Sequence, residues 1–142
     1  MAQWTKEQYD AITNRGGALL VSAAAGSGKT AVLVERIVRF ITEERQPVDR
    51  FLVVTYTNAA AAEMRGKIIA ALTECLAQQP EDAFLRRQLF LVQKAQITTV
   101  HAFCHRLVRE HFNQLELKPD FSIGEENTLR SLQQAAVEDC ME

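Results

Sequence analysis

The sequence predicts an α/β fold in which a parallel sheet is flanked by helices. Short β-rich segments alternate with longer helical patterns along the 142 residues, an order typical of βαβ units. A glycine-containing loop, Ala23–Thr30, separates the first strand-like segment from the helix after it. The composition, 47% hydrophobic and 24% charged residues, is typical of a soluble globular protein.

The N-terminal half begins with a capped helix over residues 4–12, because Thr5 can be its N-cap and Gln8 its capping-box partner. Asn14–Gly17 ends this helix. Residues 18–22 are the first expected strand, and residues 29–44 have apolar positions at a helical spacing. Residues 45–49 form a loop before a second, buried strand over residues 51–56.

The C-terminal half continues the alternation. Asn58 can cap a helix from residue 59 to about residue 76, and a second helix is expected over residues 81–94. Residues 96–100 form the third expected strand, and residues 101–115 the next helix. A short extended piece at 121–123 and a last helix from residue 126 complete the prediction.

Charge and composition exclude some classes of protein. The net charge of −2 excludes a strongly basic nucleic-acid binder but not a local groove for a single strand. No apolar run approaches the roughly 20 residues that span a bilayer, and residues 1–5 have neither the basic start nor the apolar core of a signal segment. We therefore expect no membrane partner and a cytoplasmic location. The three cysteines form no C-x-x-C pair, so we expect reduced thiols.

The loop Ala23–Thr30 predicts a nucleotide site. It fits the pattern G-x-x-x-x-G-K-[ST], except that Ala23 stands at the first position. In such a loop, backbone N–H groups and a helix N-terminus hold phosphates, a lysine reaches the β- and γ-phosphates, and a hydroxyl binds Mg²⁺. The expected ligands are ATP and Mg²⁺, with Lys29 and Thr30 as catalytic residues and Thr30 as the Mg²⁺ contact. The expected ATP-binding residues in the loop are Ala23, Ala24, Ala25, Gly26, Ser27, Gly28, Lys29 and Thr30.

Three further segments resemble motifs of the UvrD/Rep/RecB helicases of superfamily 1. Residues 54–65 (VTYTNAAAAEMR) are similar to a strand-to-helix motif of that family, and residues 97–104 (ITTVHAFC) to its T-x-H motif. The resemblance implies single-stranded DNA contacts for Thr57, Asn58, Thr99 and His101. Thr57 and Asn58 can instead only cap a helix, and His101 can be an ordinary first-turn residue.

Gln8 lies in a segment, WTKEQ, that resembles the family's glutamine motif, which implies that its amide reads the adenine edge. Its alternative role is the capping box. Many relatives carry arginine directly after the loop threonine, where Ala31 stands here, which weakens the expectation for base binding.

The resemblance implies a RecA-like P-loop NTPase fold with an incomplete first motor domain. Residues 1–115 would be part of motor domain 1A, and residues 116–142 the start of inserted subdomain 1B. It also implies the helicase–nuclease branch, which acts in double-strand-break repair and recombination. There, ATP hydrolysis drives translocation on single-stranded DNA, double-stranded DNA is a further ligand, and a second helicase–nuclease subunit is the partner.

The family's acidic Asp-Glu pair at the end of a later strand, and its arginines from a second motor domain, have no counterpart in this sequence. We therefore expect an N-terminal piece of a larger protein, which alone binds ATP weakly, hydrolyses it negligibly and has unpaired strand edges.

Three other interpretations stay open at this stage. The chain can be a small P-loop kinase or NTPase, although it has no arginine-rich lid segment. It can be a non-enzymatic module that binds nucleotide or single-stranded DNA. His101, Cys104 and His105 also have a spacing that can hold Zn²⁺, without an evident fourth ligand.

Overall fold

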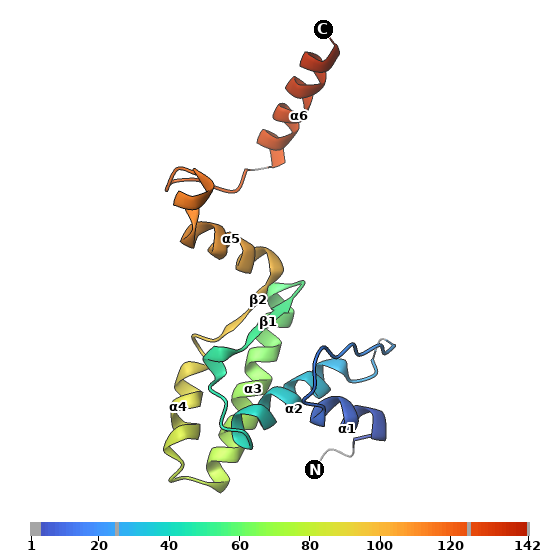
Figure 1. Ribbon diagram of the computed structural model, residues 1–142, viewed down its shortest axis with the longest axis vertical. Coiled ribbons are helices and arrows are strands. Elements are labelled where there is room, and N and C mark those ends of the chain that lie inside the picture. The colour runs from blue at the N-terminus through green and yellow to red at the C-terminus, as the bar shows by residue number, and fades with distance from the viewer. Residues whose placement is uncertain (1–3, 25, 125, 142) are drawn as a thin grey trace. The chain divides into compact units, whose positions relative to one another are not determined.

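The computed structural model describes residues 4–24, 26–124 and 126–141 (Figure 1). The chain divides into two compact units, residues 1–103 and 104–142. Each unit is described by itself below. The predicted boundary between motor subdomains after residue 115 is a different division and stays a prediction.

The first unit begins with α1 (Lys6–Thr13) and α2 (Lys29–Thr42), which pack against each other. The predicted capping box of α1 is present: the Thr5 side chain accepts the Gln8 N–H, and the Gln8 side chain accepts the Thr5 N–H. Ala11 and Ile12 of α1 form a small buried cluster with Val32 of α2. This contact fixes α1 beside the start of α2.

The sheet of the described residues has two parallel strands, β1 (Leu52–Thr55) and β2 (Gln96–Thr99). Their register pairs Leu52 with Gln96 and Thr55 with Thr99. The predicted second strand is present as β1, but the prediction that it is buried holds only for one face: Val53 is buried, whereas Leu52 and Val54 are 48% and 46% exposed. Side chains of a strand alternate between its faces, and only one face of β1 meets the core.

Two helices connect the strands. The long α3 (Asn58–Gln78) follows β1, and α4 (Ala83–Leu91) returns beside it to β2, with the short 3₁₀ helix η1 (Val48–Arg50) against α4 (Figure 1). Thr57 is the N-cap of α3, and Asn58, predicted as the cap, is its first helical residue. The main core lies between α2, α3, α4 and the inner face of the sheet; its buried residues are Val34, Ile37, Val38, Ile41, Val48, Val53, Ala61, Met64, Ile68, Leu72, Leu85, Val92, Ala95 and Ile97.

The strand predicted at residues 18–22 is absent: this segment is not part of a sheet. It is exposed along its length, with Leu20 at 93% and Val21 at 44%. A β-rich segment becomes a strand only when a neighbouring strand takes up its backbone hydrogen bonds. Among the described residues, β1 and β2 pair with each other and no strand pairs with residues 18–22. The predicted three-stranded sheet is therefore two-stranded here.

The helix α5 (Val100–Glu110) begins in the first unit, and its last residues belong to the second. The predicted helix over 101–115 is interrupted at His111, after which residues Phe112–Leu115 form the 3₁₀ helix η2. Residues 121–123 belong to no helix and to no strand, so the short extended piece expected there stays a prediction. The last helix, α6 (Glu126–Met141), agrees with the prediction. Within the second unit, none of the side chains whose burial is described is fully buried.

Candidate nucleotide site and nucleic-acid contact segments

The start of α2 has the backbone that a phosphate loop needs. Gly26 has φ 77° and Gly28 has φ 83°, left-handed values that glycine adopts without a Cβ clash. Gly28 is the N-cap of α2, and no side chain caps this helix. The first-turn N–H groups of an uncapped helix lack internal partners and carry partial positive charge, so they suit an anion. Ala25, one of the expected loop residues, lies outside the described residues.

Lys29 folds back over its own loop. Its ammonium donates to the carbonyl oxygens of Ala23 at 2.6 Å and Ala24 at 2.7 Å. Its neighbour Thr30 is exposed, and its hydroxyl has no hydrogen bond with the part of the chain that the structure describes. A lysine, a free hydroxyl and an uncapped helix start are therefore within one turn of α2, which fits the donor set for a polyphosphate with Mg²⁺.

Gln8 links α1 to the phosphate loop. Its amide oxygen accepts the Thr5 N–H at 2.9 Å, and its amide nitrogen donates to the Ser27 carbonyl at 3.2 Å. The predicted capping role of Gln8 is therefore present, and the same side chain contacts the loop, whereas its reading of the adenine edge stays a prediction. Gln8, Ser27 and Lys29 also line a cavity of about 300 Å³ between α1 and the loop.

A further hollow at the loop has a volume of about 480 Å³. Gly26, Gly28, Lys29 and Thr30 line it, and so does Lys67 of α3. Sequence reasoning missed Lys67, because its pairing with Glu63 four residues earlier has the pattern of an ordinary surface pair on a helix. Its position beside the loop follows only from the packing of α2 against α3.

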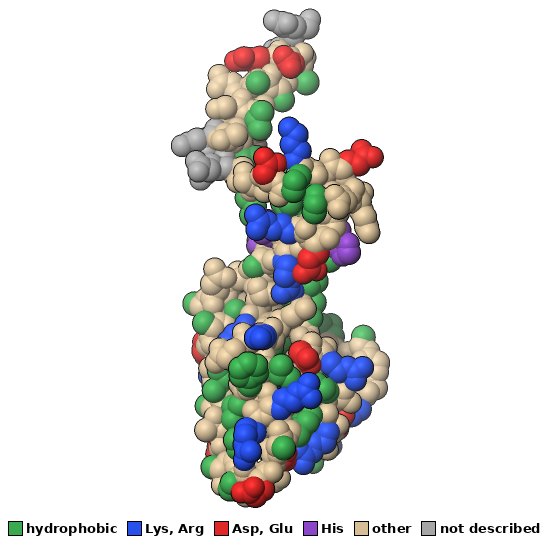
Figure 2. Space-filling view, turned by 90° about the vertical axis from the view of Figure 1, so that its left-hand side faces the viewer, with side chains coloured by type: hydrophobic (Ala, Val, Ile, Leu, Met, Phe, Trp, Pro, Cys, Tyr) green, Lys and Arg blue, Asp and Glu red, His purple; other side chains and the backbone are tan. Residues whose placement is uncertain are grey.

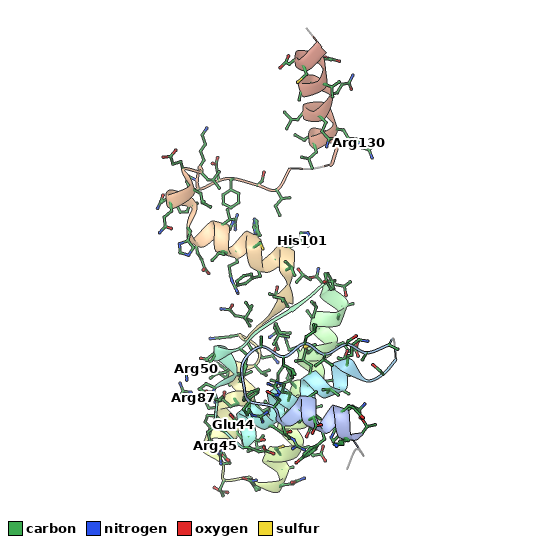
Figure 3. All side chains as sticks on the ribbon, turned by 45° about the vertical axis from the view of Figure 1, so that its right-hand side comes forward. Glu44, Arg45, Arg50, Arg87, His101 and Arg130 are labelled. Atoms are coloured by element: carbon green, nitrogen blue, oxygen red, sulfur yellow. The ribbon has the colours of Figure 1, made fainter. Side chains whose placement is uncertain are left out.

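The expected DNA-contact residues come together at one edge of the sheet. Thr57 and Asn58 follow β1, and Thr99 and His101 lie where β2 passes into α5 (Figure 3). Because Thr55 pairs with Thr99 in a parallel register, the carboxyl ends of the two strands are adjacent.

These four residues differ in what is available for a ligand. Thr57 and Thr99 both use their hydroxyls as helix caps, for the N–H groups of Ala60 at 3.1 Å and Ala102 at 3.2 Å. Thr99 is buried, whereas Asn58 and His101 are exposed. Capping is thus present at Thr57 and also at Thr99. The exposed amide and imidazole are the polar groups most open to a ligand.

Sequence reasoning also missed Tyr56, which lies between β1 and the cap of α3. Its side chain is 95% exposed, which is unusual for a large aromatic residue. An exposed ring next to polar groups is a platform on which a nucleic-acid base can stack. The signal in the sequence was an aromatic residue at the end of a strand, directly before a threonine and an asparagine.

Charge is dispersed over the surface. On the face drawn in Figure 2, Lys and Arg side chains are interspersed with hydrophobic and acidic ones within each unit. This agrees with the net charge of −2.

The described residues contain no group of three or more His, Cys, Asp or Glu side chains that could hold a metal ion, so the zinc interpretation of His101, Cys104 and His105 was wrong. The three cysteines are unpaired thiols, as predicted. Within the described ranges, no helix has the length and apolar character to cross a bilayer.

The comparison with protein families decides between the classes left open by the loop. Residues 4–142 match the UvrD/REP helicase N-terminal domain family. The chain belongs to this family. The resemblance drawn from the loop, the strand ends and Gln8 is thereby confirmed at the level of the family.

Individual members of the UvrD/REP helicase family give the same result. The chain is 56% identical, over 99% of its length, to a protein from Thermoanaerobacter sp. strain X514 that is named as a subunit of an ATP-dependent helicase/nuclease. It is 51% identical to the protein of that name from Acetivibrio thermocellus and 48% identical to that from Clostridioides difficile, again over 99% of the chain. The chain spans only 11–12% of the length of these relatives.

Proposed function

We propose that the chain is the N-terminal ATP-binding part of an ATP-dependent DNA helicase/exonuclease of the AddA kind, which acts in double-strand-break repair and recombination. The observation that carries the proposal is the uncapped start of α2, where Lys29, Thr30 and two left-handed glycines surround one anion-binding position. Membership of the UvrD/REP helicase family and the names of its relatives support it.

ATP would occupy the loop. Its phosphates would take the first-turn N–H groups of α2, Lys29 would exchange the Ala23 and Ala24 carbonyls for phosphate oxygens, and Thr30 would contact Mg²⁺. The bound Mg²⁺ supplies charge neutralisation. Gln8 already lies beside the loop, where its amide can turn from Ser27 toward a base. The fold that we propose is the P-loop, RecA-like one.

DNA would lie along the carboxyl edge of β1 and β2. Asn58 and His101 would contact the strand as exposed polar groups, and Tyr56 would stack on a base. Thr57 and Thr99 would hold their helices in place and can add contacts through their remaining lone pairs. In the whole protein, hydrolysis at the loop would drive movement along a single strand, in the cytoplasm and together with an AddB-like second subunit.

The isolated chain would lack hydrolysis. Stabilising a transferring phosphoryl group requires an acidic metal ligand and cationic groups placed around the phosphates. β1 and β2 end in Thr55 and Thr99, and neither is followed by an acidic pair. The family favours a helicase over a small kinase. A non-enzymatic module remains the second candidate, since the chain by itself would bind ligands without turnover.

The first prediction tests the proposal in the full-length protein. Lys29→Ala removes the ammonium and should lower single-strand-stimulated ATP hydrolysis by at least about a hundredfold, because charge stabilisation at the transferring phosphoryl group contributes that much or more. Phosphate release is measured with and without an oligonucleotide. Single-strand binding without nucleotide should persist in Lys29→Ala and weaken with salt.

Lys67→Ala is the matched control, since it removes a second lysine beside the loop without touching the motif. It should keep more of the stimulated activity than Lys29→Ala. If single-stranded DNA does not stimulate ATP hydrolysis by the wild-type protein, the helicase function is contradicted. The non-enzymatic binding module would then be the remaining candidate.

A further inference from the structure

We infer that Arg65 of α3 is a positioning residue, which holds β2, and with it Thr99 and His101, in place relative to Thr57 and Asn58. The inference rests on the proposed function, because it concerns how the two DNA-contact segments stay aligned.

The side chain of Arg65 donates hydrogen bonds to backbone carbonyls from the end of α4 to β2. Its guanidinium donates to the carbonyl oxygens of Val92, Gln93 at 3.2 Å, Ala95 at 3.2 Å and Ile97 at 2.9 Å. Carbonyls at the end of a helix have no partner inside it, and a cation there also meets the negative end of the helix dipole. A single half-buried side chain therefore binds the end of α4, the turn after it and β2.

The strand β2 depends on such bonds. It has only four residues, and among the described residues its strand neighbour is β1. A pair of short strands is marginally stable on its own. Ile97 lies two residues before Thr99, so a change in the position of Ile97 moves the N-cap of α5 and His101 with it.

The helix α3 connects the two contact segments. Thr57 is its N-cap, and Arg65 follows eight residues later, about two helical turns along the axis. The helix α3 therefore begins in the first contact segment, directly after Thr57. About two turns further on it carries Arg65, which binds β2, the strand that leads into the second contact segment. Direct contact of Arg65 with DNA is disfavoured, because its terminal nitrogens already donate to these carbonyls.

The test uses two substitutions at Arg65 in the full-length protein. Arg65→Met keeps an aliphatic stem but removes every donor, and Arg65→Lys returns the charge with up to three donors. Arg87→Met is the control: Arg87 is an exposed arginine of α4 whose side chain makes no hydrogen bond or ion pair with the described residues (Figure 3). Binding of oligo-dT is measured by fluorescence anisotropy at several salt concentrations, and nucleotide affinity is measured beside it.

We expect Arg65→Met to weaken oligo-dT binding about tenfold, since several hydrogen bonds to a charged group are lost. Nucleotide affinity and the slope of log K against log salt should not change. Arg65→Lys should recover most of the affinity, and Arg87→Met should resemble the wild type. Combined with Thr99→Ala, Arg65→Met should cost less than the sum of the single effects, because Arg65 acts through Thr99 and its neighbours. Amide hydrogen exchange over residues 97–102 should accelerate in Arg65→Met and not in Arg87→Met.

Five results would overturn the inference. A slope reduced by about 0.7 in Arg65→Met would show a direct phosphate contact. Equal losses of nucleotide and DNA binding in both Arg65 variants would show a general effect on stability. Additive effects with Thr99→Ala, or unchanged exchange over residues 97–102, would show that Arg65 does not act on β2.

If Arg65→Met does not fold, Arg65→Lys is used in its place in the double-mutant cycle with Thr99→Ala and in the hydrogen-exchange experiment. A wild type that binds no oligo-dT contradicts the proposed function, whereas a binding wild type with an unaffected Arg65→Met contradicts this inference alone.

Discussion

Gly28, at the start of α2, combines a left-handed backbone with a close neighbour. Gly28 has φ 83°, and a Cβ at this position would meet the Gln8 amide nitrogen at 3.4 Å. Any other residue must therefore adopt a left-handed conformation beside a side chain that itself contacts the loop. The left-handed conformation at the start of α2 requires a glycine. The position of Gly28 in the G-K-[ST] motif indicates this requirement in the sequence.

The second prediction compares Gly28 with a glycine inside α3. Gly28→Ala should destabilise the fold by about 1–2 kcal/mol, because an L-residue pays that much for left-handed backbone, and it should weaken nucleotide binding. Gly66→Ala should stabilise by about 0.5–1 kcal/mol, because alanine favours helix and a Cβ there meets nothing within 4 Å. Thermal unfolding of both variants checks the pair, and an unaltered or raised Tm for Gly28→Ala would contradict the account.

Predictability at this scale varied with the kind of signal. The Thr5–Gln8 capping box was predicted from two residues three apart, since capping is local chemistry. Tyr56 and Lys67 were missed, because exposure and proximity to the loop depend on how distant segments pack. The cap of α3 was misplaced by one residue, since Thr57 and Asn58 are both good cap residues.

At the scale of elements, α4 shows how a helix is fixed at both ends. Its N-cap, Asp82, accepts the N–H groups of Phe84 and Leu85 at 3.0 and 3.1 Å and forms an ion pair with Arg45 at 2.6 Å. Its C-terminal end meets Arg65. The Arg45 hydrogen bond, followed by the Leu85 N–H, lowers the pKa of the Asp82 carboxyl below its ordinary value.

The third prediction follows from this pKa. A carboxyl whose pKa is lowered by folding stabilises the fold at every pH above its ordinary value, and this contribution is lost as the pH falls through the lowered pKa. Asp82 should therefore titrate below a free aspartate in a carbon-detected NMR titration. Asp82→Ala should lower the Tm at neutral pH, because the N-cap hydrogen bonds to Phe84 and Leu85 and the ion pair with Arg45 are lost. An ordinary Asp82 pKa, or stability of Asp82→Ala equal to the wild type at pH 7, would refute this role.

Most helices were predictable because apolar spacing, as in α2, and capping residues, as in α1, are local features of the sequence. Residues 18–22 were not, although their composition favours a strand. A strand exists through its neighbours, and β1 and β2 pair with each other instead. The same dependence explains why β1 buries Val53 and leaves Leu52 and Val54 partly exposed: a strand is buried by what covers each face, which its own residues do not specify.

At the scale of the whole molecule, the two units differ in what holds them. The first unit has a continuous core drawn from α2, α3, α4 and both strands. In the second, no side chain whose burial is described is fully buried, and Leu129, Leu132 and Val137 of α6 are 50–63% exposed. Regions with few buried apolar contacts open first. The alternation of helices and strands was visible in the sequence, but this difference in packing was not.

The fourth prediction is that limited proteolysis of this chain cuts within residues 104–142 before it cuts the first unit. Local opening exposes backbone to a protease, and a core raises the free energy of opening. Mass spectrometry of the early fragments should find a persistent product that contains residues 4–103. Early cleavage inside α3 or α4 would show that the two units are equally stable.

The lysine that folds over its own loop has a consequence for selectivity. The Lys29 ammonium already donates to the Ala23 and Ala24 carbonyls. An arriving anion must therefore displace these carbonyl oxygens to take the same hydrogen bonds. An anion that takes only one of these bonds exchanges one hydrogen bond for another and gains little, since the net value of a hydrogen bond is about 1 kcal/mol. A polyphosphate chain brings several oxygens at once and overcomes the competition. We therefore expect the loop to favour a polyphosphate over a single small anion, which competitive binding of ATP against inorganic phosphate measures.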